Sequence, residues 1–249
     1  MSNSLTIEYK KWGMKRVINT SIPSKCEEMD PKQFIAFAKL TFLMEENPVI
    51  KPEILAQMIK IPVGVAKNIE PLEQESITSQ MDFLWDMRPV SSFLLEKMAG
   101  YYPPLPHLEG VTFGQFMYFD SYFSQYAKEK DESNLHKFIA AVYLPKGKPF
   151  NHTDIATRAK HFEKVHMAHK QAVVLNYHLI REWLSVKYPL VFPKKKQPDN
   201  TKSKKQPGWI DVFDAIVGDD IKDSEKYAEK PLHNVLRFIN KKIKEGMKK

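Results

Sequence analysis

Residues 152–188 carry the longest run of helical periodicity in the chain, and this run constrains the fold most strongly. Its apolar side chains recur every three or four positions, which places them on one face of a helix. These side chains are Val165, Ala168, Ala172, Leu175, Leu179, Trp183 and Val186. Pro189 should end the helix, because a proline disfavours helical geometry in the residue before it.

Two other helices are indicated by capping signals at their first residues. Asp30 precedes Pro31 and Gln33, so the aspartate can cap the helix while the glutamine bonds back to it. Thr112 and Gln115 repeat this spacing ahead of a second segment rich in aromatic residues. Further helices are expected over 53–60, 63–69, 73–87 (with Met81, Leu84 and Trp85) and 133–143.

The first residues differ from the rest because their periodicity is that of a strand. Leu5, Ile7 and Tyr9 alternate with polar residues, and Gly13 can turn the chain, so residues 4–20 are predicted to form a short hairpin. The predicted fold class is therefore mainly α, with an N-terminal β-hairpin, a helical body and a small C-terminal helical module.

Two parts of the helical body align with each other. The segment from Met29 matches the segment from Val111 at an offset of 82, and both place a glutamine and a phenylalanine after the cap. Residues 55–62 match 138–145 at an offset of 83, and both end in proline. A duplicated unit, spanning 28–100 and 110–192, would explain this. Any two well-capped amphipathic helices would also look alike, so both interpretations stay open.

The net charge of +8 is concentrated in two late segments. Residues 193–208 hold six lysines and one aspartate, and residues 241–249 hold five lysines and one glutamate, so the remainder is close to neutral. We expect 1–192 to form the helical body and 193–208 a flexible linker that lacks apolar periodicity. Residues 209–249 should form the small helical module with its basic tail.

The lysines of the linker are candidates for contacts with nucleic-acid phosphates. Such contacts would be independent of sequence and would weaken with salt. Fixed sites usually combine arginine and aromatic side chains with lysine on a folded face, and both basic segments lack them. A solvated linker and tail is the simpler interpretation. The linker lysines are Lys194, Lys195, Lys196, Lys202, Lys204 and Lys205.

The cellular location is constrained by cysteine usage and by apolar segments. The single cysteine, Cys26, allows no internal disulfide and fits a reducing compartment. The opening MSNSLTIEYKK lacks the apolar core of a signal peptide, and no apolar run approaches the roughly 18 residues of a membrane span. We therefore expect a soluble, intracellular protein without a membrane partner.

Catalytic motifs are missing from the sequence. It contains neither Gly-x-Ser-x-Gly nor a Walker-type Gly-Lys-Ser/Thr, so we expect no enzyme and no cofactor. The best metal candidate joins Glu163 and His166, three apart as in di-iron bundles, with His161 and His169 nearby. A matching Glu-x-x-His is absent, and a helix with interfacial histidines explains the same residues.

Three segments resemble the tail assembly chaperone type of proteins from tailed bacteriophages and prophages. They are residues 22–34 after the β segment, residues 110–116 with 135–145, and residues 209–218 with 234–243. The resemblance implies a β-containing start followed by helices, and a role in holding the tape-measure protein soluble while the tail assembles. It transfers no functional residue. A duplicated body is a departure from that type.

Our leading hypothesis from the sequence is a non-enzymatic assembly or chaperone-type protein that binds another protein, with a phage tape-measure protein as the expected partner. It would act in the cytoplasm of the host cell, with virion association as an alternative. A basic-tailed nucleic-acid-binding protein and a helical metalloprotein are the other hypotheses. The predicted protein-binding residues come from a crowded aromatic region. They are Phe113, Tyr118, Phe119, Tyr122 and Tyr126.

Overall fold

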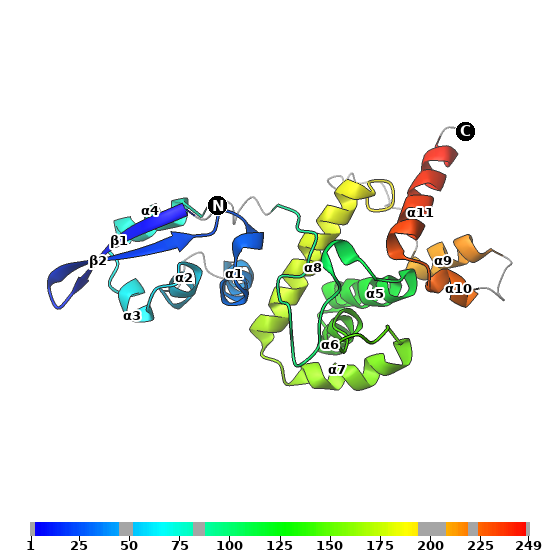
Figure 1. The fold of residues 1–249 in the computed structure, drawn as a ribbon, viewed down its shortest axis with the longest axis horizontal. Coiled ribbons are helices and arrows are strands. Elements are labelled where there is room, and N and C mark those ends of the chain that lie inside the picture. The colour runs from blue at the N-terminus through cyan, green and yellow to red at the C-terminus, as the bar shows by residue number, and fades with distance from the viewer. Residues whose placement is uncertain (1–2, 45–51, 82–87, 194–207, 219–223, 248–249) are drawn as a thin grey trace. The chain divides into compact units, whose positions relative to one another are not determined.

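The structure is a computed structural model that describes residues 3–44, 52–81, 88–193, 208–218 and 224–247. The chain divides into two compact units. Unit 1 comprises Met1–Val90 with His166–Leu179, and unit 2 comprises Ser91–Val165 with Ile180–Lys249. The described residues are mainly helical and begin with a two-stranded hairpin (Figure 1), which confirms the predicted fold class.

Unit 1 begins with the β-hairpin that was predicted for residues 4–20. Strand β1 (Asn3–Lys11) pairs antiparallel with strand β2 (Met14–Ile22). The turn residues Trp12 and Gly13 have φ angles of 54° and 76°. A two-residue turn with both φ angles positive matches the twist of the strands that it joins. The buried apolar side chains of the hairpin are Leu5, Ile7 and Ile22.

The helices of unit 1 are short and follow one another closely. They are η1 (Cys26–Glu28), α1 (Pro31–Met44), α2 (Pro52–Met58), α3 (Val63–Ala66), α4 (Pro71–Ser79) and the first part of α8 (Met167–Lys187). The helix predicted over 73–87 is shorter than expected. It ends at Ser79, and a turn bond from the Met81 N–H to the Thr78 carbonyl follows. Leu84 and Trp85 lie outside the described residues.

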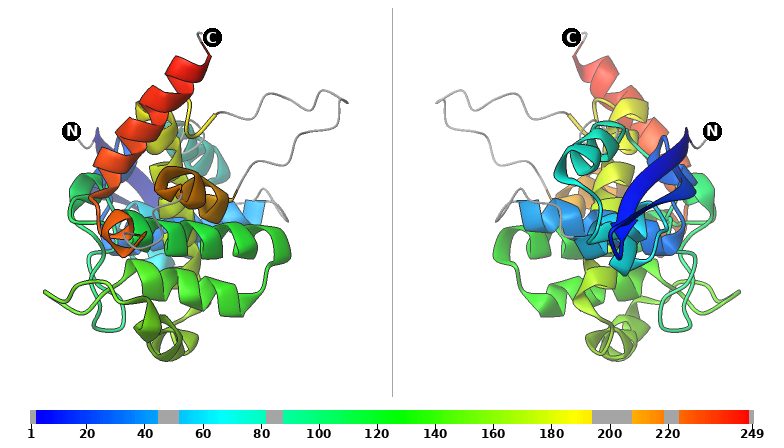
Figure 2. Two further views of the ribbon diagram at one scale, coloured as in Figure 1. Left: turned by 90° about the vertical axis from the view of Figure 1, so that its right-hand side faces the viewer. Right: turned by 90° about the vertical axis from the view of Figure 1, so that its left-hand side faces the viewer.

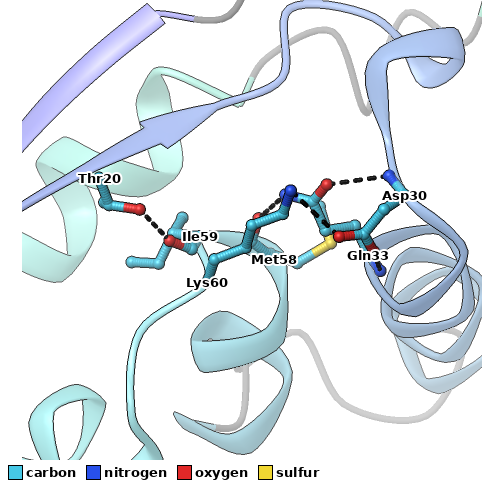
Figure 3. A network of polar contacts seen from close by, with 6 residues as sticks. All are labelled: Thr20, Asp30, Gln33, Met58, Ile59 and Lys60. Atoms are coloured by element: carbon cyan, nitrogen blue, oxygen red, sulfur yellow. Dashed lines mark hydrogen bonds and ion pairs between the residues drawn. The ribbon is translucent and has the colours of Figure 1, made fainter.

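A buried glutamine joins α1 to α2 in unit 1. The Gln33 N–H donates to Asp30 Oδ1 at 2.9 Å, and the Asp30 N–H donates to Gln33 Oε1 at 3.0 Å. The predicted capping box is therefore confirmed. Gln33 Nε2 also donates to the Met58 carbonyl at 2.7 Å, as Figure 3 shows. One side chain thus caps α1 and bonds to the end of α2.

Unit 2 is built around two neighbouring helices, α5 (Phe113–Glu129) and α6 (Glu132–Val142), with α7 (Ile155–Glu163) against α6 (Figure 2). Its short 3₁₀ turns are η3 (Pro106–Leu108) and η4 (His152–Asp154). The chain is completed by the end of α8, α9 (Trp209–Val217), α10 (Ser224–Ala228) and α11 (Leu232–Gly246).

The start of α5 repeats the arrangement at the start of α1. Thr112 Oγ1 accepts a hydrogen bond from the Gln115 N–H at 3.1 Å. The buried Gln115 side chain then donates through Nε2 to the Ala141 carbonyl at 3.0 Å. Ala141 lies 83 residues after Met58, the offset that aligns the two segments in the sequence. Gln115 therefore joins α5 to α6 in the same way as Gln33 joins α1 to α2.

The prediction of one long helix over 152–188 is wrong in one respect, because the chain forms two helices there. Helix α7 ends at Glu163, and α8 (Met167–Lys187) begins after His166. His166 Nδ1 accepts a hydrogen bond from the Ala168 N–H at 3.1 Å. The His166 ring therefore supplies a hydrogen-bond acceptor to the first turn of α8. The break between the two helices cannot be seen in the sequence, because the apolar pattern continues through it.

The C-terminal helices belong to unit 2, so the predicted division at the linker differs from the division that the structure shows. The Phe113 N–H donates to the Lys230 carbonyl at 2.9 Å, and the Leu232 N–H donates to the Val111 carbonyl at 3.0 Å. A Cβ placed on Gly114 would lie 3.1 Å from the Ala228 Cβ. The close approach of α10 to α5 thus depends on a glycine at this position.

No helix within the described ranges combines the length and the apolar character that crossing a membrane requires.

Candidate protein-binding surface

The five aromatic residues predicted to bind a protein lie on two different faces of α5. Phe113 and Phe119 are buried in unit 2, with exposures of 1% and 0%. They share a face with Phe116 and Phe123, which are also buried, because positions three and four apart align on a helix. Their assignment to a binding surface is therefore wrong.

The three predicted tyrosines lie beside this buried face, at intervals of four residues along α5. Tyr118 is 36% exposed, while Tyr122 and Tyr126 are half-buried. The ring centroids of Tyr118 and Tyr122 lie 6.4 Å apart. We call these three residues the tyrosine row. A four-residue interval keeps them adjacent along two turns of one rigid helix.

Two further rings extend the tyrosine row at its first turn. The ring of His152 stacks on Tyr118 with the centroids 5.6 Å apart and the planes 7° from parallel. Phe150 lies 5.7 Å from the same tyrosine. Both residues come from the segment between α6 and α7, so sequence periodicity on α5 could not identify them. Through these two contacts, the Tyr118 ring packs between the body of α5 and the segment that joins α6 to α7.

Lysines lie over the other two rings of the row. Lys137 Nζ is 5.9 Å from the Tyr122 centroid, and Lys130 Nζ is 5.7 Å from the Tyr126 centroid. Burial raises the pKa of Tyr122 and of Tyr126 above the usual value. A tyrosine hydroxyl is protonated at neutral pH even at its ordinary pKa of about 10, so both side chains can donate hydrogen bonds. The row combines flat apolar rings, neutral hydroxyl donors and two flanking cations.

The opposite side of α5 is fixed by a buried carboxylate that sequence reasoning missed. Asp120 is 2% exposed, and its Oδ2 accepts a hydrogen bond from Trp209 Nε1 at 2.6 Å. Its Oδ1 lies 3.3 Å from Arg181 Nε. Trp209 also contacts the rings of Phe113 and Phe116. Helix α9 is therefore held on α5 by both charge and aromatic packing, and the tyrosine row faces away from it.

The lysines predicted to contact phosphate lie outside the described residues, so their arrangement stays a prediction. They are Lys194, Lys195, Lys196, Lys202, Lys204 and Lys205.

The predicted histidine and glutamate cluster has other contacts in the structure. His161 lies against the ring of Tyr101 with the centroids 5.7 Å apart, and His166 bonds to the first turn of α8. Among the residues that the structure describes, no three His, Cys, Asp or Glu side chains are grouped so that they could hold a metal ion.

The single cysteine is a buried residue. Cys26 is 3% exposed in η1. Burial, followed by the charge of Glu27, raises the pKa of its thiol to about 11. The thiolate that nucleophilic chemistry needs is therefore scarce at neutral pH.

Comparison with known proteins adds no family to this description. No family model matches the chain, and neither a curated protein nor a solved structure matches it.

Proposed function

We propose that this chain is a non-enzymatic assembly or chaperone-type protein that binds another protein through the tyrosine row of α5. The partly exposed row, built on one helix and flanked by lysines, is the observation that supports this proposal. The phage or prophage setting, with action in the cytoplasm of the host cell, rests on the sequence resemblance alone.

The chemistry of tyrosine suits a binding surface of this kind. A tyrosine side chain buries a large apolar area on binding and loses little conformational entropy, because it has only two rotatable bonds. Its hydroxyl keeps a hydrogen bond at the rim of the contact. Tyrosines are among the residues that dominate binding energy in protein interfaces. Tyr118 contacts the rings of Tyr122, Phe150 and His152, and Tyr126 follows on the next turn of α5.

The proposed partner is a long helical protein that exposes apolar segments before assembly, as a tape-measure protein does. Such a segment could lie along α5 and cover the row, with its carboxylates near Lys130 and Lys137. Complementary charge at the edge of an apolar contact contributes mainly to orientation and to association rate. The lysines are therefore expected to select the direction of the segment.

The test is co-expression with the tape-measure protein of the phage or prophage that encodes this chain. We expect the wild-type chain to keep the partner in the supernatant and to copurify with it. A triple substitution of the row, Tyr118→Ala with Tyr122→Ala and Tyr126→Ala, should reduce the recovered partner at least tenfold, because interface tyrosines commonly contribute about 2 kcal/mol each.

The matched control replaces two exposed apolar residues elsewhere in unit 2, Leu105→Ala with Val186→Ala, which are 63% and 64% exposed. This control should leave partner recovery unchanged. Circular dichroism must show that both variants are folded. A partner whose solubility does not depend on the wild-type chain would contradict the chaperone role. Equal loss in the triple variant and the control would contradict the role of the tyrosine row.

A further inference from the structure

The outer end of the hairpin in unit 1 is unusual because both of its faces are in solvent. Residues 10–17, which we call the hairpin tip, are all exposed. Farther from the turn the same ribbon is anchored, since Leu5 and Ile7 are buried. Figure 1 shows the tip reaching beyond the helices of its own unit. The tip therefore contributes little to the hydrophobic core of unit 1.

Positive charge is concentrated in this tip. Its eight residues include Lys10, Lys11, Lys15 and Arg16, and they include no carboxylate. Lys10 lies directly opposite Lys15 in the strand register. Like charges at directly opposed positions destabilise a hairpin. The carboxylates of Glu70 and Glu8, which lie near these two lysines, offset part of this repulsion.

The two faces of the tip differ in how their charges are balanced. On one face, Lys10 Nζ lies 2.8 Å from Glu70 and Lys15 Nζ lies 3.5 Å from Glu8. Lys11 and Arg16 lie on the other face, because side chains alternate along a strand. No carboxylate of the described residues forms an ion pair with either of them.

Apolar side chains are exposed beside these cations. Trp12 is 87% exposed at the turn, and Met14 and Val17 are 53% and 60% exposed. Lys11 Nζ lies 5.1 Å from the centroid of the Trp12 ring. The positive φ angles of Trp12 and Gly13 fix a tight turn, so the indole is presented at the end of a regular ribbon.

We propose that the hairpin tip binds double-stranded DNA by entering a groove. A two-stranded ribbon fits the width of the major groove, and cations on both of its faces can reach the phosphates on both sides. An exposed apolar side chain at the end of such a ribbon can contact base edges in the same groove, such as the methyl group of thymine. In this arrangement Lys11 and Arg16 contact phosphates, and Trp12 contacts the bases.

Duplex DNA fits the tip better than the other polyanions do. A single strand would lie along one face, whereas a groove also brings phosphates to Lys10 and Lys15, whose exposed ion pairs with Glu70 and Glu8 are weak enough to exchange. An anionic membrane would also meet only the end of the ribbon. This site lies in unit 1 and is independent of the tyrosine row, so it adds a second binding activity to the proposed function.

The test is fluorescence anisotropy of a labelled 30-base-pair duplex titrated with the intact chain at several salt concentrations. Lys11→Gln with Arg16→Gln should lower the affinity by about 10-fold to 100-fold at 0.1 M salt. It should also reduce the slope of log affinity against log salt by about 2, since each phosphate contact contributes about 0.9. Trp12→Ala should lower the affinity about tenfold and leave the slope unchanged, because its contact with the base edges is apolar and releases no counterion.

The matched charge control is Lys146→Gln with Lys148→Gln, two exposed lysines of unit 2. It should retain wild-type affinity and slope within about twofold. Lysines elsewhere in the chain are common to all variants, so their contribution cancels in the comparison. Wild-type and tip variants that bind the duplex equally would overturn the proposal. Equal or tighter binding of a single strand, or binding only to phosphatidylserine vesicles, would also overturn it.

Discussion

Replacing Gln115 by methionine tests whether the buried glutamines hold the helix pairs together. Methionine keeps nearly the same volume but cannot donate a hydrogen bond to the Ala141 carbonyl, which Gln115 Nε2 contacts at 3.0 Å. A buried carbonyl left without its partner costs about 1–3 kcal/mol. We therefore expect Gln115→Met to lower the free energy of unfolding by about 2 kcal/mol.

Gln33→Met tests the same hydrogen bond independently in unit 1. Gln33 loses its 2.7 Å bond to the Met58 carbonyl and also the bond that its Oε1 accepts from the Asp30 N–H. With two bonds removed, its cost should equal or exceed that of Gln115→Met. Urea denaturation followed by circular dichroism measures both values, with hydrogen exchange to assign each loss to its unit.

The control for both variants is Gln125→Met, which changes an exposed glutamine of α5. It should change the free energy of unfolding by less than about 0.5 kcal/mol, as surface substitutions usually do. If the buried substitutions behave like this control, the hydrogen bonds do not hold the helix pairs, and the reasoning is refuted.

Three further predictions concern the C-terminal helices and the cysteine. Asp120→Ala should lower the free energy of unfolding by about 2–3 kcal/mol and make the chain near Gly208 more sensitive to limited proteolysis, because Trp209 Nε1 loses its charged acceptor. Unchanged protease resistance would contradict this. Gly114→Val should make the segment after Ala228 more sensitive to protease, since a side chain at this position meets α10 at 3.1 Å; a wild-type cleavage pattern would refute the close contact. Cys26 should react with iodoacetamide at pH 8 only after unfolding, because burial raises the pKa of its thiol to about 11; rapid labelling of the folded chain would show that the thiol is accessible.

Local features of the fold could be predicted from the sequence because their signals lie within a few residues. The hairpin follows from alternation around Gly13, and the starts of α1 and α5 follow from Asp30 and Thr112. The break before α8 could not be predicted, because His166 interrupts a helix without interrupting its apolar periodicity. Helical boundaries of this kind depend on one side chain.

The candidate surface was partly predictable. Spacing alone could not remove Phe119 from the predicted surface, because it lies three residues before Tyr122 and seven before Tyr126 on the same helix. The partners Phe150 and His152 come from another segment, and Trp209 meets Asp120 across 89 positions of sequence. Contacts at such distances leave no local pattern.

The positive charge of the hairpin tip does not appear in the net charge summed over the rest of the chain. The chain outside the two lysine-rich segments is nearly neutral in total, yet residues 10–17 alone contain four cations. A local count beside Trp12 would have indicated the tip before the structure did.

The matched glutamines lead us to propose that the two helix pairs arose from one duplicated unit. Gln33 and Gln115 are 82 residues apart, and their acceptors Met58 and Ala141 are 83 apart, which agrees with a single insertion between them. Buried Phe34 and Phe37 likewise correspond to buried Phe116 and Phe119. The tyrosine row has no such counterpart, because Ala36 and Leu40 are buried at the positions of Tyr118 and Tyr122. The binding surface would then be specific to the second copy.

The most direct test of the proposed function is photo-crosslinking from the tyrosine row during co-expression with the tape-measure protein. A benzoylphenylalanine placed at Tyr118 should form a covalent adduct with the partner on illumination. The same group placed at Val186, which is 64% exposed, should form none. An adduct from position 118 alone is the result that we predict. No adduct from position 118, or equal adducts from both positions, would contradict binding through the tyrosine row.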